Sequence, residues 1–229
     1  MAVAPAPRKS KAARTPAPAP AATVADLLKR LGVPPSRVRL TPPLGTATER
    51  DLIATNAKKE CLVELVDGVL VEKPMGSEES NWAALLIMHI TAFVLRHDLG
   101  KVYVPDGPYK LAPGLIRLPA VAFLSWARYR KPKHRGEIPA VAPDLAVEIL
   151  SRSNTKREME RKLGEYFAAG VRLAWVVDPR RREVRVFTSP TDPVVLTAAD
   201  VLDGGDVLPG FRLPLAEWFE QAERDGPAR

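Results

Sequence analysis

The segment that most constrains the fold is a nearly all-apolar run from Asp144 to Leu150, directly after Pro143. A short run that is apolar at almost every position is typical of a strand covered on both faces. The pattern then predicts a helix from Lys156 to Ala169 and another apolar strand from Leu173 to Val177. A strand buried on both sides needs packed layers around it, so we expect a sheet flanked by helices.

The rest of the chain predicts further strands and helices around these elements. Asp67-Gly68 supplies a tight turn between two apolar runs, which indicates a hairpin near the start of the domain. Other expected elements are short helices at Val24–Leu31 and around Trp218, a helix from Glu78 to about His97 capped by Ser77, extended segments at Lys101–Val104, Tyr109–Leu111 and Arg117–Trp126, and an edge strand at Glu183–Thr188. This order predicts an α/β protein with an α+β mixed sheet and helices packed on it.

The length of 229 residues fits one domain with tails. Residues 1–22 are rich in Ala and Pro, with basic but no acidic residues, and we expect them to form a disordered arm. Residues 23–59 are expected to be a short helix and a connector, residues 60–219 the domain, and residues 220–229 a tail.

The cysteine and histidine content narrows the class of protein. Cys61 is the single cysteine, and the three histidines (His89, His97 and His134) are scattered. An internal disulfide is therefore impossible, a Cys/His zinc site is excluded, and a reducing cytoplasm is the expected location. No apolar run approaches the roughly 18 residues of a membrane span, so no membrane association is expected.

The formal charge of +7 and the pI near 9.7 favour a polyanionic partner such as nucleic acid. Four of these charges lie in the first 25 residues, on Arg8, Lys9, Lys11 and Arg14. A basic tail that only aids solubility is the alternative interpretation.

Glu148 is the most informative single residue. It shares one face of its strand with Asp144, Ala146 and Leu150, and it is a lone carboxylate in an apolar run. Burying an unpaired charge is costly, so a metal or a basic side chain should lie opposite it. A structural ion pair, with Arg172 or a lysine of the next helix, is the alternative to a functional site.

Lys162 is the expected companion of Glu148. It lies at the border of the apolar stripe of the second helix, three residues after Met159 and four before Tyr166. It could lean over the sheet toward Glu148, or extend its amine to solvent as a surface lysine does.

Six motifs in this order resemble a known family. They are Glu-Leu-Val-Asp-Gly at residues 64–68, a helix, Leu-Pro-x-Val-Ala-Phe at 118–123, Ala-Pro-Asp-Leu-Ala-Val-Glu-Ile-Leu-Ser at 142–151, Lys-Leu-x-Glu-Tyr-Phe-x-Ala-Gly-Val at 162–171 and Trp-Val-Val-Asp-Pro at 175–179. Over residues 60–219 the chain resembles the Uma-type restriction-endonuclease-like proteins of the PD-(D/E)XK nuclease superfamily. The resemblance implies a four- or five-stranded mixed sheet flanked by helices.

The resemblance also implies a site and a reaction. Mg²⁺ (or Mn²⁺) would be held by Glu148 and an Asp of the preceding core strand, and Lys162 would serve as the catalytic lysine, because position 150 is Leu. Mg²⁺ prefers oxygen ligands, and a lysine can orient the attacking water and offset charge on the phosphate. The implied reaction is phosphodiester hydrolysis of DNA, and the superfamily often works as homodimers.

One position departs from the family pattern. Where the family has Pro-Asp-Val, this chain has Pro119-Ala120-Val121, and alanine offers no oxygen ligand. Loss of one of two anionic ligands predicts a weak or inactive nuclease with weakly bound metal. Glu79, which matches a family position and is our choice for a second metal ligand, could substitute, as could Asp106 or Asp144.

Each substitute also has a purely structural interpretation. Glu79 in a first helical turn favours the helix dipole, Asp106 before Gly107 suits a turn, and Asp144 can start its strand.

Three hypotheses on function remain open. The first is a Mg²⁺-dependent endonuclease acting through Glu148 and Lys162. The second is a nucleic-acid-binding module that does not cut and that uses the basic arm and the loop Arg128–Arg135, in which five of eight residues are Lys or Arg and one is aromatic. The third is a structural or partner-binding domain with no nucleic-acid role.

Overall fold

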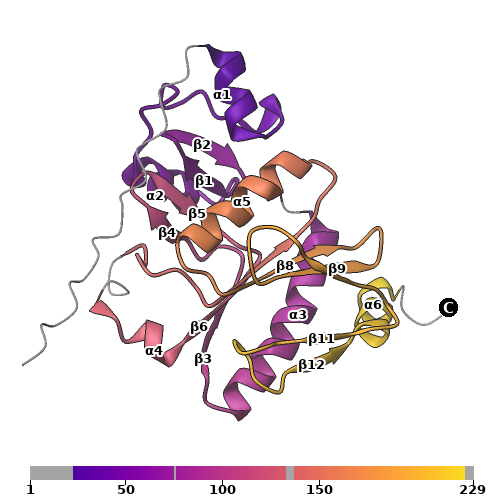
Figure 1. Cartoon of the computed structure of the whole chain (residues 1–229). Helices are drawn as coiled ribbons and strands as arrows, with labels where there is room; N and C mark the ends of the chain where they lie inside the picture. Colours follow the sequence, from indigo (N-terminus) through magenta and orange to yellow (C-terminus); the bar gives the residue numbers. More distant parts are fainter. Residues whose placement is uncertain (1–22, 75, 133–136, 225–229) are drawn as a thin grey trace, which may run out of the picture.

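The computed structural model describes residues 23–74, 76–132 and 137–224, and its centre is a mixed six-stranded sheet (Figure 1). The strands are β3 (Gly100–Tyr103), β6 (Val121–Ser125), β7 (Leu145–Ile149), β8 (Leu173–Asp178), β9 (Glu183–Phe187) and β10 (Val194–Leu196), in the order β10-β9-β8-β7-β6-β3. The β7 and β8 strands are parallel, and the other neighbours are antiparallel. The predicted mixed sheet is confirmed, although it has six strands where the resemblance implied four or five.

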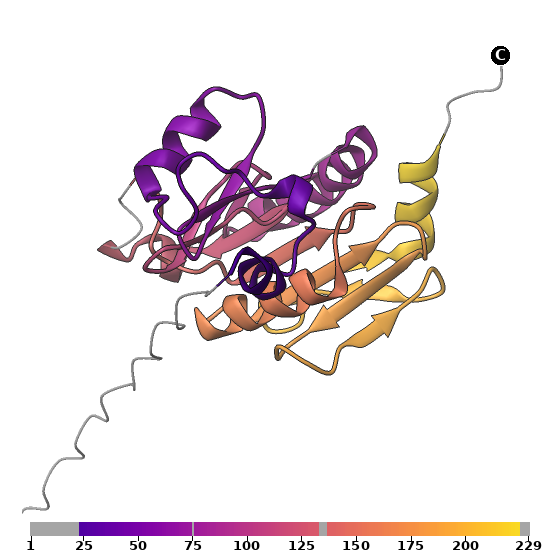
Figure 2. The ribbon, with the colours of Figure 1, turned by 90° about the horizontal axis from the view of Figure 1, so that it is seen from above.

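Helices cover both faces of this sheet, as the two-sided burial of β7 predicts. On one face lie α3 (Ser77–Arg96) and α6 (Leu215–Glu223), which pack against Val147 and Trp175. On the other lies α5 (Lys156–Ala168), the crossover between β7 and β8, which packs against Ala146 and Val176 (Figures 1 and 2). Alternate residues of each central strand therefore face different helices.

A second sheet of four antiparallel strands lies beside α5 (Figure 1). Its strands are β1 (Val63–Val66), β2 (Val69–Glu72), β4 (Tyr109–Ala112) and β5 (Leu115–Arg117), in the order β2-β1-β5-β4. The β1–β2 turn has φ of +52° at Asp67 and +71° at Gly68, which agrees with the predicted hairpin. Arg161 of α5 contacts the Asp67 carboxylate at 3.1 Å, so an ion pair ties this sheet to the helix.

The N-terminal part of the described chain also packs on α5. Helix α1 (Val24–Leu31) has the predicted bounds, and a 3-10 turn covers Pro35–Arg37. Thr155 donates a hydrogen bond to the carbonyl of Gly32, and Arg37 makes two 2.8 Å bonds to the Glu158 carboxylate. The expected disordered arm, residues 1–22, lies outside the described residues.

Several predicted elements differ from the observed ones. The predicted connector contains α2 (Glu49–Ala57), which begins at a capping box between Thr48 and Asp51. Gly76, not Ser77, is the N-cap of α3. The predicted segment 117–126 divides between β5 and β6 and ends in the short helix α4 (Trp126–Tyr129).

The C-terminal half also contains strands that the sequence did not predict. The β9 strand is not at the edge of the sheet, because β10 pairs outside it. A separate pair of strands, β11 (Val201–Asp203) and β12 (Arg212–Pro214), precedes α6. Within the described ranges, no helix combines the length and apolarity that a bilayer crossing requires.

Candidate active site

Glu148 lies one residue before the end of β7, in the middle of the main sheet. Its neighbours in the strand, Val147 and Ile149, belong to the core on the α3 face, so the Glu148 side chain points to the α5 face. The residue is only 7% exposed. A carboxylate so enclosed needs compensating donors or cations.

Lys162 of α5 is the main compensating charge. Its Nζ lies 3.2 Å from Oε1 of Glu148 and 3.2 Å from Oε1 of Glu64, and the residue is 2% exposed. The expected proximity of Glu148 and Lys162 is therefore observed, while the alternative of a solvent-facing lysine is wrong. Arg172 lies near Asp144, at 3.7 Å, and is not the partner of Glu148.

The charge of Lys162 is maintained by its carboxylate neighbours. Burial alone would lower the pKa of this amine, but the carboxylates of Glu148 and Glu64 outweigh burial and raise the pKa. Lys162 is thus a fixed cation at neutral pH, suited to stabilise negative charge next to it.

The two oxygens of Glu148 have different surroundings. Oε1 accepts hydrogen bonds from Lys162 and from the hydroxyl of Tyr166, the latter at 2.5 Å. Oε2 accepts no hydrogen bond from any residue in the described ranges. One face of the carboxylate is therefore anchored, and the other remains available to a ligand.

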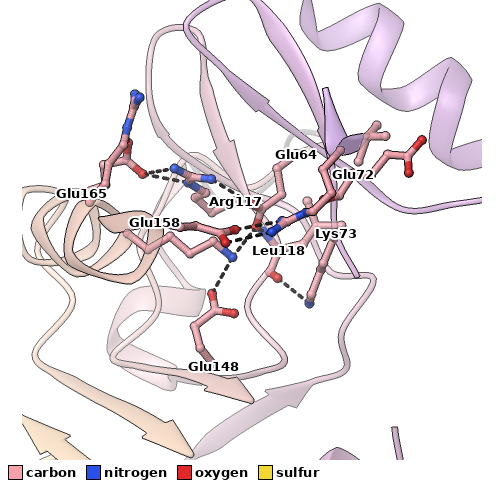
Figure 3. A network of polar contacts seen from close by, with 12 residues as sticks. Glu64, Glu72, Lys73, Arg117, Leu118, Glu148, Glu158 and Glu165 are labelled. Carbon is pink, nitrogen blue, oxygen red and sulfur yellow. Dashed lines mark hydrogen bonds and ion pairs between the residues drawn. The ribbon is translucent and has the colours of Figure 1, made fainter. Parts of the chain in front are cut away.

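The Lys162 amine is held by its contact with Glu64, which belongs to a buried ion network with Arg117 and Glu165 (Figure 3). Glu64 is fully buried; its Oε2 accepts a 2.8 Å bond from Arg117 and its Oε1 a 3.0 Å bond from the Leu118 amide. Arg117 also pairs with Glu165 at 2.6 Å. Burial acts to raise the pKa of Glu64, but the charges of Lys162 and Arg117 and the amide of Leu118 lower it to about 2.

Our sequence reasoning did not identify this network as part of the site. Glu64 carries the same signal as Glu148, because it is a lone carboxylate among apolar residues of a strand. Arg117 lies between Ile116 and Leu118, and could have been paired with Glu64 on the same argument.

Glu148 and Lys162 open onto a small cavity of about 10 Å³, room for roughly one water molecule or ion. The lining residues are Lys73, Pro74, Glu79, Ala120, Glu148, Ile149, Asn154 and Lys162. Lys73 donates to the carbonyls of Leu118 (2.6 Å) and Pro105 (3.3 Å). Burial is the main cause that lowers the pKa of Lys73, to about 8.

Ala120 lies in this cavity wall, just before β6, with its amide bonded to the Val147 carbonyl at 2.8 Å. Because Ala120 and Glu148 line the same cavity, a longer side chain at position 120 can extend into it. The alanine side chain itself leaves that part of the wall without an oxygen ligand.

Of the three substitute carboxylates, Glu79 alone lines the cavity. Its Oε2 also accepts the Gly76 amide at 3.0 Å, so the helix-capping role is observed as well. Asp144 is engaged elsewhere, by Arg128 at 3.0 Å and by the Ser125 amide, and Asp106 is exposed.

The donor set decides what cation could fit. Within the described residues, no group of three or more His, Cys, Asp or Glu side chains is arranged to hold a metal. Two carboxylates, Glu148 and Glu79, face one small cavity, and Mg²⁺ is often fixed by one or two carboxylates plus water. The residues therefore fit a divalent cation bound weakly.

A model of the Uma2 family, described as "Putative restriction endonuclease", matches residues 51–216. This match covers most of the chain. The chain belongs to the Uma2 family. Uma2 membership supports a nuclease function, a nucleic-acid substrate and the use of a divalent metal that is general among restriction-endonuclease-like proteins.

The fold agrees with this Uma2 assignment. A crystal structure from Anabaena variabilis, titled "putative nuclease belonging to DUF820", matches with a TM-score of 0.64 and 17% identity, over 71% of this chain and 92% of that one. At this identity the likeness concerns the fold. A search of curated proteins found no match.

The described part of the basic loop, residues 128–132, lies at the far end of β6 from this Uma2 site. Ala120 precedes β6 and Trp126 follows it, a separation of about 20 Å along an extended strand. Arg128 is held by Asp144 and by the carbonyls of Ala142, Pro143 and Gly170. Arg130 and Lys131 are exposed, and residues 133–136 lie outside the described ranges.

Proposed function

We propose that this chain hydrolyses phosphodiester bonds of DNA in a Mg²⁺-dependent reaction, at a rate reduced by the alanine at position 120. The observation that carries the proposal is the uncommitted Oε2 of Glu148, which shares a cavity with the buried amine of Lys162. Family membership supports the nuclease reaction and nucleic acid as substrate. We propose DNA as the substrate, and not RNA, because restriction endonucleases act on DNA.

In this proposal Glu148 and Glu79 hold the metal, Mg²⁺ or Mn²⁺. When bound, the cation would lower the pKa of a water and neutralise charge on the phosphate. Lys162 is the second catalytic residue: its amine orients the attacking water and offsets charge that grows on the phosphate oxygens. Tyr166 and Glu64 position Glu148 and Lys162 through the contacts described above.

Position 120 gives the sharpest test. Ala120→Asp places a carboxylate beside Glu148, where Lys73 and Lys162 can compensate its charge. Because a missing metal ligand costs orders of magnitude in rate, we expect plasmid cleavage in Mg²⁺ or Mn²⁺ to rise about 100-fold or more. Ala120→Asn is the matched control, equal in size but uncharged, and should give little gain.

Two further variants separate the outcomes. Ala120→Asp combined with Glu148→Gln should lose the gained cleavage. Equal cleavage by the native chain and by Ala120→Asp would show that Glu79 already completes the site, and Glu79→Gln should then abolish it. If no variant cuts DNA or RNA while circular dichroism shows a folded protein, the enzymatic proposal fails.

A second function, binding of nucleic acid without cleavage, is favoured by one observation. The ammonium group of Lys73 lies in the cavity wall with Glu148, where it competes electrostatically with a metal ion. In that case the native chain should bind labelled DNA in EDTA, with affinity that falls steeply as salt rises, but should not cut it. Absence of any salt-dependent binding would leave the structural-domain hypothesis.

The oligomeric state is a separate question. Light scattering of the full chain tests the homodimer expected from the superfamily resemblance, and a monomer mass at all concentrations would contradict it.

A further inference from the structure

A second, larger depression lies on the other flank of α5. It has a volume of about 860 Å³ and is bounded by the first half of α5, by β8 to β10 and by the loops that follow β8 and β9. This size is within the range of about 300–1,000 Å³ for ligand sites. We name it the α5 groove.

The α5 groove meets the catalytic cavity at the start of α5. Asn154 lines both, and Leu150 in the groove follows Ile149 in the cavity. Because β7 and β8 are parallel, their carboxyl ends lie at the same edge of the sheet. Glu148 and the loop that follows Asp178 therefore share this edge.

The floor and the rim of the α5 groove differ in chemistry. The floor is apolar, with buried Leu163, Val176 and the ring of Phe187. Arg185 lies opposite Val176 in the β8–β9 register, so its guanidinium rises from the same face of the sheet.

Basic side chains dominate the exposed rim at the end nearest the catalytic cavity. Arg180 is exposed and makes no ion pair with the described residues. The side chain of Arg181 is 65% exposed, and its one ion pair, with Asp178, is long at 3.8 Å. Lys156 is also exposed. Three acidic residues also line the groove: Asp178 is buried, Glu160 is paired with Lys156, and Asp192 is exposed in the β9–β10 loop. Asp192 lies at the other end of β9 from Arg180 and Arg181, so the charge offered to a ligand at the end nearest the catalytic cavity is positive.

We propose that the α5 groove binds a single-stranded segment of the nucleic acid whose phosphate enters the catalytic cavity, a proposal that rests on the proposed function. Phosphates of this segment contact Arg180 and Arg181, and one base lies on the apolar floor beside Arg185. Nonspecific strand binding commonly combines such cationic contacts with an apolar platform for bases.

The test measures fluorescence anisotropy of a labelled short oligothymidylate with the full chain in EDTA, where cleavage plays no part. We expect Arg180→Glu with Arg181→Glu to weaken binding at least 10-fold and to reduce the salt dependence by about two phosphate contacts. The matched control is Arg96→Glu with Arg212→Glu, which changes the net charge equally on exposed residues outside the groove. It should weaken binding no more than about threefold.

The nature of the ligand is tested with two other probes. An abasic strand of the same length, and a duplex of the same sequence, should each bind several-fold more weakly than the oligothymidylate, because neither offers an unpaired base. Equal affinity for all three probes would overturn the base-binding part, and equal losses in the groove and control variants would overturn the proposal.

Three more outcomes separate this proposal from its alternatives. If the native chain is a dimer that Arg180→Glu with Arg181→Glu dissociates, the groove is an interface between copies and the proposal is wrong. Groove variants that lose binding, while Ala120→Asp gives no cleavage, would retain the groove and reject the catalytic proposal. Cleavage by Ala120→Asp that the groove variants leave unchanged would support the catalytic proposal and reject the groove.

Discussion

Glu64 and Glu148 are both single carboxylates in apolar strands, and both contact the same amine of Lys162 at 3.2 Å. Glu64 uses both oxygens, on Arg117, Leu118 and Lys162, and it is completely buried. Glu148 uses one oxygen and leaves the other toward a cavity. The first carboxylate is saturated with partners, and the second is held in place but incomplete.

The difference follows from where each residue lies in its sheet. Glu64 is inside β1, under Arg117 of the neighbouring β5 and against α5. Glu148 is one residue from the end of β7, where the sheet edge meets the start of α5 and the cavity. A buried carboxylate is therefore best judged by the number of its oxygens that are satisfied, since an unsatisfied oxygen indicates a place for a ligand.

The largest expected effect separates the two carboxylates by stability. Glu64→Gln leaves Arg117 and Lys162 under-compensated in the protein interior, so we expect a loss of about 3 kcal/mol or more in the free energy of unfolding. Glu148→Gln, beside a cavity that can admit water, should cost about 1 kcal/mol. Urea unfolding measures the free energy of unfolding of both variants. Equal losses in this free energy would contradict the distinction between the two residues.

A pH titration sharpens the same comparison. The pKa of Glu64 is about 2 in the folded protein against an ordinary 4.5, so its ionised form stabilises the fold above pH 4.5. This stabilisation, roughly 3 kcal/mol, should disappear as the pH falls from 4.5 to 2, because protonation removes the charge that Arg117 and Lys162 require. The stability difference between the native chain and Glu64→Gln should shrink over this window; a constant difference would show that Glu64 is not the group that titrates.

What the sequence could predict about the site depended on local signals. The apolar run around Glu148, the helix that follows it and the position of Lys162 on the border of an apolar stripe are all properties of neighbouring residues. These local patterns predict which face of the strand packs against which face of the helix, and the 3.2 Å contact between Glu148 and Lys162 follows from that packing. The alanine at position 120 was visible for the same reason, because it interrupts a short motif.

The parts that the sequence did not predict depend on distant pairing. Arg117 meets Glu64 across 53 residues, and Arg37 meets Glu158 across 121. Such contacts depend on how the strands of two sheets align and on where the N-terminal segment runs. Neither can be read from the pattern of apolar residues within one element. Helix α2 is a different case. Its capping box, formed by Thr48 and Asp51, is a local signal in the sequence that predicts the start of a helix.

Lys73 and Lys162 offer a smaller contrast. Both residues line one cavity, but among the described residues only the amine of Lys162 contacts carboxylates directly. The pKa of Lys73 is lowered to about 8 in the folded protein, chiefly by burial, against an ordinary 10.5. Between these values the unfolded chain binds more protons, so stability should rise with pH. We expect a gain of about 3 kcal/mol or less, because a shift of one pKa unit corresponds to about 1.4 kcal/mol. Urea unfolding at pH 8 and 10.5 measures this gain, and Lys73→Met should lose it. The same change in the free energy of unfolding in the native chain and in Lys73→Met would show that Lys73 is not the group that titrates.

The smallest effect concerns the anchored oxygen of Glu148. Tyr166→Phe removes the hydroxyl that donates to Oε1, so we expect a loss of about 1 kcal/mol in the free energy of unfolding. Tyr109→Phe is the matched control, because the buried hydroxyl of Tyr109 makes no hydrogen bond with the described residues. Its removal should be neutral or slightly stabilising, since no partner is left behind. If both variants lose the same stability, the bond from Tyr166 does not anchor Glu148, and the contrast between its two oxygens loses its physical basis.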